Sequence, residues 1–155
     1  MGILSDRDIE EAIKEGRIEI ENFTEKNLTP NGYDLTIAEI YVNGRIYREG
    51  KIKIPPNTWF AISTKETIRL GPDICAQLWI RSSYARKGIL ASFGKVDAGF
   101  KGTLTIGCFN GSNKEVEIPV GDTFCQIVFE EMKTEASKTY EQRSGKYQNQ
   151  KGLTL

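Results

Sequence analysis

The stretch TLTIGCFNGSNKEVEIPVGDTFCQIVF, residues 103–129, decides the fold class. It contains short runs of β-branched, aromatic and other apolar residues, separated by the turn signals NGSN (110–113) and PVGD (119–122). Such runs, with Gly, Asn, Pro and Asp between them, are typical of strands joined by tight turns. The stretch therefore predicts β-structure rather than helices.

The same pattern continues outward over most of the chain, from about Tyr33 onward. Further predicted strands are DLTIAEIYV (34–42), KIKI (51–54), TWFAIST (58–64), ICAQLWI (74–80) and GILAS (88–92). We find no βαβ alternation, internal repeat or linker between them. Many short strands with this punctuation suggest a β-sandwich, a jelly roll or a small barrel. We therefore predict one mainly-β domain over residues 1–155.

The N-terminal segment, residues 1–16, predicts a helix over residues 5–15. Ser5 is a suitable N-cap, and Gly16 is a suitable stop. Apolar residues follow at helical spacing, so one face of the helix can pack on the domain. We interpret this helix as a stabilising element rather than as part of a site.

The C-terminal segment, residues 134–155, is polar and has neither helical nor strand periodicity. Such a tail is often a frayed terminus. It nevertheless contains several Arg, Lys and Gln side chains and the aromatic ring of Tyr147, which suit an anionic ligand with a ring to stack on. The alternative is therefore a flexible lid that closes over a binding site.

Composition excludes several classes of function. The chain has 21 basic and 21 acidic residues, so no basic excess points to nucleic acid as a partner. It has no histidine, which excludes a Ser-His-Asp triad, a His-ligated zinc and the zinc-deaminase signature. No apolar run is long enough to cross a membrane, and the N-terminus does not resemble a signal peptide. We expect a soluble, cytoplasmic protein whose three widely spaced cysteines are reduced and buried.

Three segments carry charge that a β-rich core does not need. In LWIRSSYARKG (78–88), an arginine followed by two hydroxyls suits a phosphate, although a surface turn explains it equally well. In FGKVDAGFKG (93–102), Asp97 could activate a water or simply form a turn. In TPNGYDLTI (29–37), Asp34 could be a turn cap or lie near a cation. Each segment is ambiguous alone.

Taken in order, these segments resemble the dUTPase/dCTP deaminase superfamily. The resemblance rests on PNGYDL (30–35), RSSYARKG (81–88), GKVDAGFKG (94–102), VGDTFCQIVF (120–129) and the tail RSGKYQNQKG (143–152). It implies a distorted jelly roll of the dUTPase-like β-clip kind. It also implies a homotrimer whose active sites are shared between subunits, and a deoxynucleoside triphosphate, dUTP, as the substrate.

The resemblance also assigns roles to individual residues. Asp97 would hold and deprotonate the attacking water. Asp34 would assist Mg²⁺ indirectly, while the triphosphate oxygens supply most of the metal's ligands. The expected substrate-binding residues are Arg81, Ser82, Ser83 and Arg86 for the phosphates, Gly94 and Val96 in a base-recognition hairpin near residues 89–96, Gln126, and the tail residues Lys146, Tyr147 and Gln150.

One position separates the two chemistries of the superfamily. In the deaminases, a Glu in the pattern G-W-x-G-x-I-x-L-E-F-x-N shuttles protons during attack on cytosine C4. The corresponding segment here is GFKGTLTIGCFN (99–110), in which Gly107 occupies the Glu position. Glycine cannot transfer a proton, so we predict a dUTP diphosphatase. The deaminase-like tail keeps open a dCTP deaminase or a bifunctional enzyme, and a nucleotide-binding protein without turnover is a further alternative.

Overall fold

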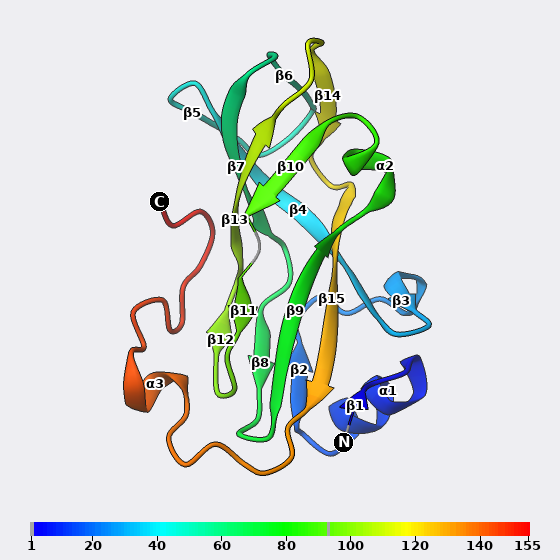
Figure 1. Cartoon of the computed structure of the whole chain (residues 1–155), viewed down its shortest axis with the longest axis vertical. Helices are drawn as coiled ribbons and strands as arrows, with labels where there is room; N and C mark the ends of the chain where they lie inside the picture. The colour runs from blue at the N-terminus through cyan, green and yellow to red at the C-terminus, as the bar shows by residue number, and fades with distance from the viewer. Residues whose placement is uncertain (1, 93) are drawn as a thin grey trace.

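The computed structural model describes residues 2–92 and 94–155, and it confirms the mainly-β, jelly-roll prediction (Figure 1). The helices are α1 Asp6–Lys14, the short 3-10 helix η1 Glu25–Asn27, α2 Ser82–Ala85 and α3 Tyr140–Arg143. The strands are β1 Gly2–Ile3, β2 Ile18–Ile20, β3 Leu28–Thr29, β4 Gly32–Val42, β5 Arg45–Tyr47, β6 Lys51–Ile54, β7 Thr58–Thr64, β8 Ile68–Leu70, β9 Ile74–Ile80, β10 Ile89–Ser92, β11 Lys95–Val96, β12 Lys101–Gly102, β13 Thr105–Asn110, β14 Val116–Pro119 and β15 Thr123–Glu131.

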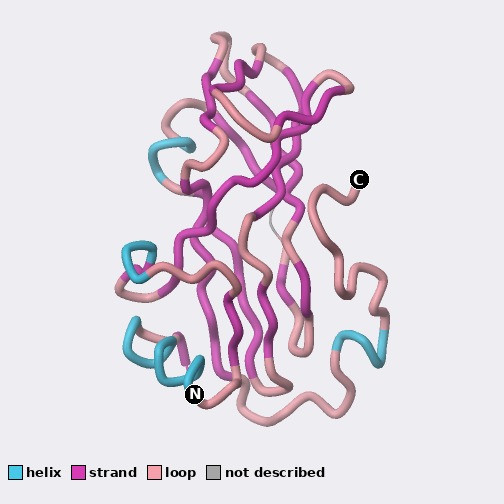
Figure 2. The backbone as a smooth tube through the Cα atoms, turned by 180° about the vertical axis from the view of Figure 1, so that it is seen from behind, coloured by secondary structure: helices cyan, strands magenta, loops and turns pink. Residues whose placement is uncertain are grey.

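Most strands belong to one curled antiparallel sheet in the order β10-β13-β7-β4-β15-β9-β11, with β1, β3 and β5 paired at its sides. A three-stranded sheet, β12-β8-β2, and a two-stranded sheet, β14-β6, complete the architecture. The strands run along the length of the molecule, and the helices lie at its periphery (Figure 2). The strands β5, β6 and β14 lie at one end, and α1 and α3 lie toward the other (Figure 1).

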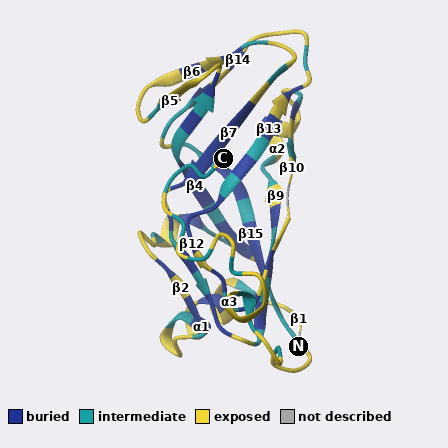
Figure 3. Cartoon of the chain, turned by 90° about the vertical axis from the view of Figure 1, so that its left-hand side faces the viewer, coloured by how far each residue is buried: buried dark blue, intermediate teal, exposed yellow. Residues whose placement is uncertain are grey.

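The core lies between the inner faces of these strands. Its largest fully buried side chains include Tyr33, Phe60, Phe124 and Phe129. Burying one such side chain stabilises the fold by about 1.5–3 kcal/mol. Figure 3 shows the buried strand segments in the interior and the exposed segments at the end that carries β5, β6 and β14.

The N-terminal helix forms as the sequence predicts. The Ser5 side chain accepts a hydrogen bond from the Asp8 backbone N–H, while the Asp8 carboxylate accepts from the Ser5 N–H. This capping box satisfies backbone donors that a helix start leaves without partners. Ile9 and Ala12 are buried against the domain. No helix of the described residues is both long and apolar enough to span a membrane.

The observed strands differ from the predicted ones in two ways. The predicted strand 103–109 is shifted, because β13 begins at Thr105 and ends at Asn110, and Lys101–Gly102 before it form the separate short strand β12. The short strands β2 and β8 were not predicted; they pair with each other, Ile18 opposite Leu70, and three-residue strands are too short to show a periodicity. Cys108 and Cys125 are buried free thiols, as expected, and Cys75 is partly buried. Burial raises the pKa of Cys108 and of Cys125, which keeps both protonated.

Candidate active site

Three of the predicted residues meet on neighbouring strands of the main sheet. Arg81 directly follows β9, Asp34 lies on β4 and Gln126 lies on β15, which is paired with both. Arg81 Nε lies 3.8 Å from Asp34 Oδ2, and Gln126 stands directly opposite Asp34 in the β4–β15 register. The sheet therefore gathers a cation, a carboxylate and an amide from three separate segments. We call Arg81, Asp34 and Gln126 the Arg81 cluster.

The Arg81 guanidinium is held in one orientation. Its Nη1 donates to Thr123 Oγ1 at 2.6 Å and to the Thr123 carbonyl at 3.2 Å. Burial raises the pKa of Asp34 above its usual range, and the Arg81 charge partly opposes that shift. A guanidinium fixed by a hydroxyl and a nearby carboxylate can present its remaining donors to a phosphate without first ordering its side chain.

Gln126 is oriented by the turn before β4. Its Oε1 accepts from Thr29 Oγ1 at 2.9 Å and from Asn31 Nδ2 at 3.1 Å, so its Nε2 is the end that can donate to an anion. Gly32 packs directly against the Gln126 side chain, because a Cβ added to Gly32 would lie 2.5 Å from Gln126 Oε1. This close approach explains why the Pro-Asn-Gly turn contains glycine at that position.

Ser82, Ser83 and Arg86 lie on or beside α2, the short helix that follows Arg81. Tyr84 anchors this helix: its ring is buried against Phe124, and its hydroxyl donates to Asp122 Oδ2. Burial and the Asp122 carboxylate raise the pKa of Tyr84, so the hydroxyl remains a donor. Ser82, Ser83 and Arg86 are exposed. α2 therefore presents both serine hydroxyls beside Arg81.

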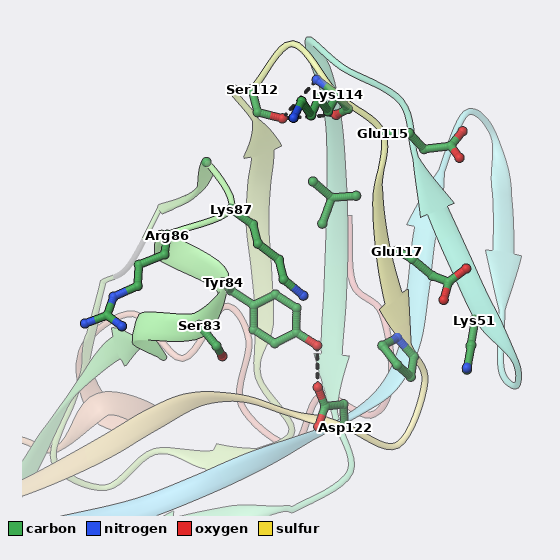
Figure 4. Close-up of a pocket in the computed structure, with 13 residues that line it drawn as sticks. Lys51, Ser83, Tyr84, Arg86, Lys87, Ser112, Lys114, Glu115, Glu117 and Asp122 are labelled. Carbon is green, nitrogen blue, oxygen red and sulfur yellow. Dashed lines mark hydrogen bonds between the residues drawn. The ribbon is translucent and has the colours of Figure 1, made fainter.

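A cavity of about 890 Å³ lies between α2 and the two-stranded β14-β6 sheet (Figure 4). Ser83 and Arg86 line it, but Arg81 and Ser82 do not. In Figure 4 the Arg86 side chain points away from the cavity, while the Lys87 side chain points into it. The cavity is therefore adjacent to the Arg81 cluster without containing it.

Asp97 lies far from the Arg81 cluster within the same chain. Its neighbour Val96 pairs with Ala76, near the start of β9, whereas Arg81 follows the end of β9. At about 3.3 Å per strand residue, the two side chains are about 20 Å apart. Asp97 is exposed and lines a separate cavity of about 400 Å³ with Cys75, Lys95, Thr139, Tyr140 and Arg143. One chain does not bring the predicted water-activating group to the predicted phosphate site.

The segment of the predicted base-recognition hairpin, near residues 89–96, contains β10 and β11, but β10 pairs with β13 and β11 pairs with β9, not with each other. It includes Phe93, which lies outside the described residues. Gly94 is exposed, and Val96 is buried on β11. Ser92, at the end of β10, stands opposite Gly107 on β13. A cavity of about 350 Å³ lies beside Gly107, lined by Trp59, Leu90, Ala91, Ser92, Gly107, Cys108 and Phe109.

The C-terminal segment differs from the sequence-based expectation, because it contains regular structure. It forms α3 and then a parallel bridge between Gln150 and Gly102. The Thr103 N–H donates to the Gln150 carbonyl at 3.0 Å, and Gln150 Nε2 donates to the Thr103 carbonyl at 2.6 Å. These long-range bonds have no local sequence signal, which explains the difference.

The last residues of the tail follow the outer face of β13. The Thr154 N–H donates to Thr105 Oγ1 at 3.1 Å, two residues before Gly107. Tyr147 is half-exposed, and Lys146 Nζ lies 5.1 Å from the centre of its ring. In its own chain the tail therefore docks along β12 and the start of β13, and not on the Arg81 cluster.

Sequence reasoning missed several residues of the site. Thr29 and Asn31 orient Gln126, and Thr123 holds Arg81; the first two lie in a turn and the third begins a strand, so each has an ordinary structural explanation in the sequence. Trp59, which borders the Gly107 cavity, was interpreted as part of a strand. Their roles depend on contacts between segments far apart in the chain.

The residues present are compatible with Mg²⁺ bound mainly by a ligand. In the part of the chain that the structure describes, no group of three or more His, Cys, Asp or Glu side chains could hold a metal ion. Asp34 supplies carboxylate oxygens within the Arg81 cluster. Mg²⁺ prefers oxygen ligands and commonly keeps several waters and substrate phosphates. Asp34 therefore suits a contact to hydrated Mg²⁺ better than a complete protein site.

Comparisons with known proteins find related sequences and structures. A model of the dCTP deaminase-like family matches residues 3–132. The chain is 42% identical over 140 residues to the dCTP deaminase of Thermococcus kodakarensis, with 88% of each chain covered. It is 40% identical over 157 residues to the probable deoxyuridine 5'-triphosphate nucleotidohydrolase of Sulfolobus islandicus rod-shaped virus 1, with 99% of this chain and 97% of that one covered.

Other relatives between 34% and 42% identity also carry the name dCTP deaminase. In fold, the chain is similar to the solved structure of 2'-deoxycytidine 5'-triphosphate deaminase from Agrobacterium tumefaciens. The TM-score is 0.73 at 18% identity, and the match covers 84% of this chain and 48% of that one.

Proposed function

The chain belongs to the dCTP deaminase-like family of the dUTPase/dCTP deaminase superfamily, and from that premise we propose that it hydrolyses dUTP to dUMP and pyrophosphate. It is an enzyme of this family in fold and in sequence. The choice between hydrolysis and deamination depends on individual side chains. Those side chains favour hydrolysis.

The observation that carries the proposal is the environment of Gly107. This residue occupies the position at which the resemblance places the deaminase glutamate. Among the described residues, the side chains that line the adjacent cavity are aromatic, aliphatic, hydroxyl or thiol groups, and none is a carboxylate. Cys108 cannot replace the glutamate, because burial raises the pKa of its thiol. Loss of a positioned acid–base group costs about 10²–10⁴ in rate.

The groups that hydrolysis requires are present, but on different parts of the chain. Arg81, with Ser82 and Ser83, is suited to the triphosphate, and Asp97 is suited to a water. Because Arg81 and Asp97 are about 20 Å apart along β9, we propose that one copy of the chain supplies Asp97 to the Arg81 cluster of another copy. A cyclic trimer would complete three such sites.

In the proposed reaction, Arg81 and the serine hydroxyls hold the triphosphate in position. Bound Mg²⁺ would neutralise charge on the phosphate oxygens. The Asp97 carboxylate of the adjacent copy orients a water and accepts its proton. The water oxygen forms a bond to the α-phosphorus while the bond from that phosphorus to the bridging oxygen breaks. The products are dUMP and pyrophosphate. Positioning and charge stabilisation supply most of the catalysis.

The second candidate is dCTP deamination. Its support is that most relatives at about 40% identity are named dCTP deaminase. As a guide to the reaction, those names favour the deaminase over the hydrolase. We give the hydrolase priority because whole-chain identity reports ancestry and fold, whereas loss of one proton-transfer group can remove one chemistry and leave the other. Ammonia release from dCTP distinguishes the two.

The variant Asp97→Asn tests the proposal, because it keeps the shape of the side chain and removes the base. We expect kcat for dUTP to fall by about 10²–10⁴, with little change in nucleotide affinity. Pyrophosphate release measures the first quantity and calorimetric titration the second. A matched control is Glu10→Gln, which removes an exposed carboxylate from α1 and should keep wild-type turnover. Near-native turnover by Asp97→Asn would contradict the assignment.

A further inference from the structure

The space that a side chain at position 107 would enter is bordered by a tryptophan. Gly107 lies on β13, between Ser92 of β10 and Ala61 of β7 in the strand register. Figure 1 shows these three strands side by side. A Cβ added to Gly107 would lie 3.4 Å from Trp59 Nε1 and 4.0 Å from Trp59 Cζ2. The N–H edge of the indole therefore borders, at van der Waals distance, the space that a residue 107 side chain would enter.

Trp59 has a defined position but is accessible. It lies on β7 opposite Phe109, and its ring meets the Tyr41 ring edge-on at 5.8 Å between centroids. Half of the residue is exposed. The Trp59 indole N–H donates no hydrogen bond to any of the described residues. The indole N–H is thus held at the cavity and available to a ligand.

The polar groups of this cavity are few. Its described lining contains no charged side chain. The buried Cys108 thiol lies 3.4 Å from the Ile106 carbonyl in its own strand, which leaves the Trp59 N–H and the Ser92 hydroxyl as the side-chain groups able to contact a polar ligand atom. A serine hydroxyl can donate or accept, whereas an indole N–H can only donate. The fixed preference of the cavity is therefore for a hydrogen-bond acceptor.

The two candidate bases differ at the atom that would lie here. If the proposed function is correct, position 107 lies beside carbon 4 of the base, because a deaminase glutamate at that position must reach it. Uracil carries a carbonyl acceptor on carbon 4, and cytosine carries an amino donor. We propose that Trp59 is a specificity-determining residue that donates from Nε1 to the O4 atom of uracil and disfavours cytosine. This inference rests on the proposed function and adds the residue that selects the base.

Binding measurements can test this inference apart from turnover. We would titrate the full-length protein, with Mg²⁺, using the α,β-imido analogues of dUTP and of dCTP. The variant Trp59→Phe keeps an aromatic ring and removes the N–H. It should weaken the dUTP analogue about three- to tenfold, the range of one hydrogen bond between neutral groups, and leave the dCTP analogue unchanged or tighter.

The control variant is Tyr41→Phe, which removes a hydroxyl from the ring packed against Trp59 and keeps that packing. It should keep the wild-type ratio of the two affinities. An unchanged ratio in Trp59→Phe, or an equal loss for both analogues, would overturn the inference, because either result means that Trp59 acts through packing alone. If the wild-type protein binds the dUTP analogue and hydrolyses dUTP, such a result leaves the proposed function intact. Failure of the wild-type protein to bind either analogue would overturn both.

Discussion

Two inactive variants should restore activity to each other when they assemble together. Arg81→Ala removes the phosphate-binding guanidinium, and Asp97→Asn removes the water-activating carboxylate. The two side chains lie about 20 Å apart in one chain, so a working site needs one from each of two copies. Each variant alone has no complete site, whereas a mixed assembly does.

The expected recovery follows from the geometry. In a randomly mixed cyclic trimer with equal amounts of the two variants, one half of the copies supply an intact Asp97, and one half of their neighbours supply an intact Arg81. About one quarter of the sites are then complete, so activity should recover to about one quarter of the wild-type value. This value requires no assumption about how strongly each residue contributes, provided that each variant alone is inactive.

The assay is pyrophosphate release from dUTP after the two variants are unfolded and refolded together. The control mixes the same two proteins after separate refolding, under conditions in which subunits do not exchange, and it should remain inactive. Mass measurement in solution checks that each preparation assembles. If the co-refolded mixture assembles but has no activity above the separate variants, Arg81 and Asp97 do not act in one shared site. The proposal that two copies of the chain share the active site is then refuted.

Removal of residues 143–155 should leave a folded protein but lower kcat/KM for dUTP about 10²-fold, because it removes Lys146, Tyr147 and Gln150, which we expect to close over the nucleotide; undiminished turnover would make the tail purely structural. Gly107→Glu should release no ammonia from dCTP, because the Trp59 N–H beside position 107 suits the O4 acceptor of uracil and not the amino donor of cytosine; efficient release would mean that only the glutamate was missing. Burial raises the pKa of Glu66 above 4.5, and this effect is larger than the opposing effect of the hydrogen bonds from the Thr36 N–H. The contribution of Glu66 to stability is therefore present below pH 4.5 and is lost as the pH rises through the raised pKa. As the pH rises from 4 to 7, the wild type should therefore lose unfolding free energy, measured with urea, relative to Glu66→Gln. A difference in unfolding free energy that does not depend on pH would contradict this account.

Local features of the fold were predictable because their causes are local. The Ser5 cap and the apolar face of α1 lie within a few residues of one another, and the strands β4, β7, β9 and β15 are long enough to show their composition. The turn after β13 also has a local cause: the Asn110 side chain donates to the Lys114 carbonyl and accepts from the Ser112 N–H. A sequence pattern can indicate each of these.

Other features depend on contacts between distant segments. Glu66, between β7 and β8, is buried although its charge suggests exposure, because both of its carboxylate oxygens accept from the Thr36 N–H of β4. The tail has no periodicity, yet Gln150 pairs with Thr103 through backbone and side chain. No spacing in the sequence indicates these partners, since each depends on how the sheet curls.

The candidate site also combines features that the sequence indicates with features that only the structure shows. The motifs identify Arg81, Asp34 and Gln126 as candidates, and the sheet brings them together. The sequence does not indicate that Asp97 lies at the other end of β9, because turns and strand lengths determine that separation. Neither does it indicate Trp59, whose relation to Gly107 results from the pairing of β7 with β13. The predicted roles of the serines and of the tail residues stay predictions.

The most direct measurement incubates the purified protein with Mg²⁺ and either dUTP or dCTP, and then determines pyrophosphate, ammonia and the nucleotide products. We predict dUMP and pyrophosphate from dUTP and no ammonia from dCTP, because no proton-transfer group stands at Gly107. Ammonia release from dCTP would contradict the central claim, since another residue would then supply the missing proton transfer and the chain would be a dCTP deaminase or a bifunctional enzyme.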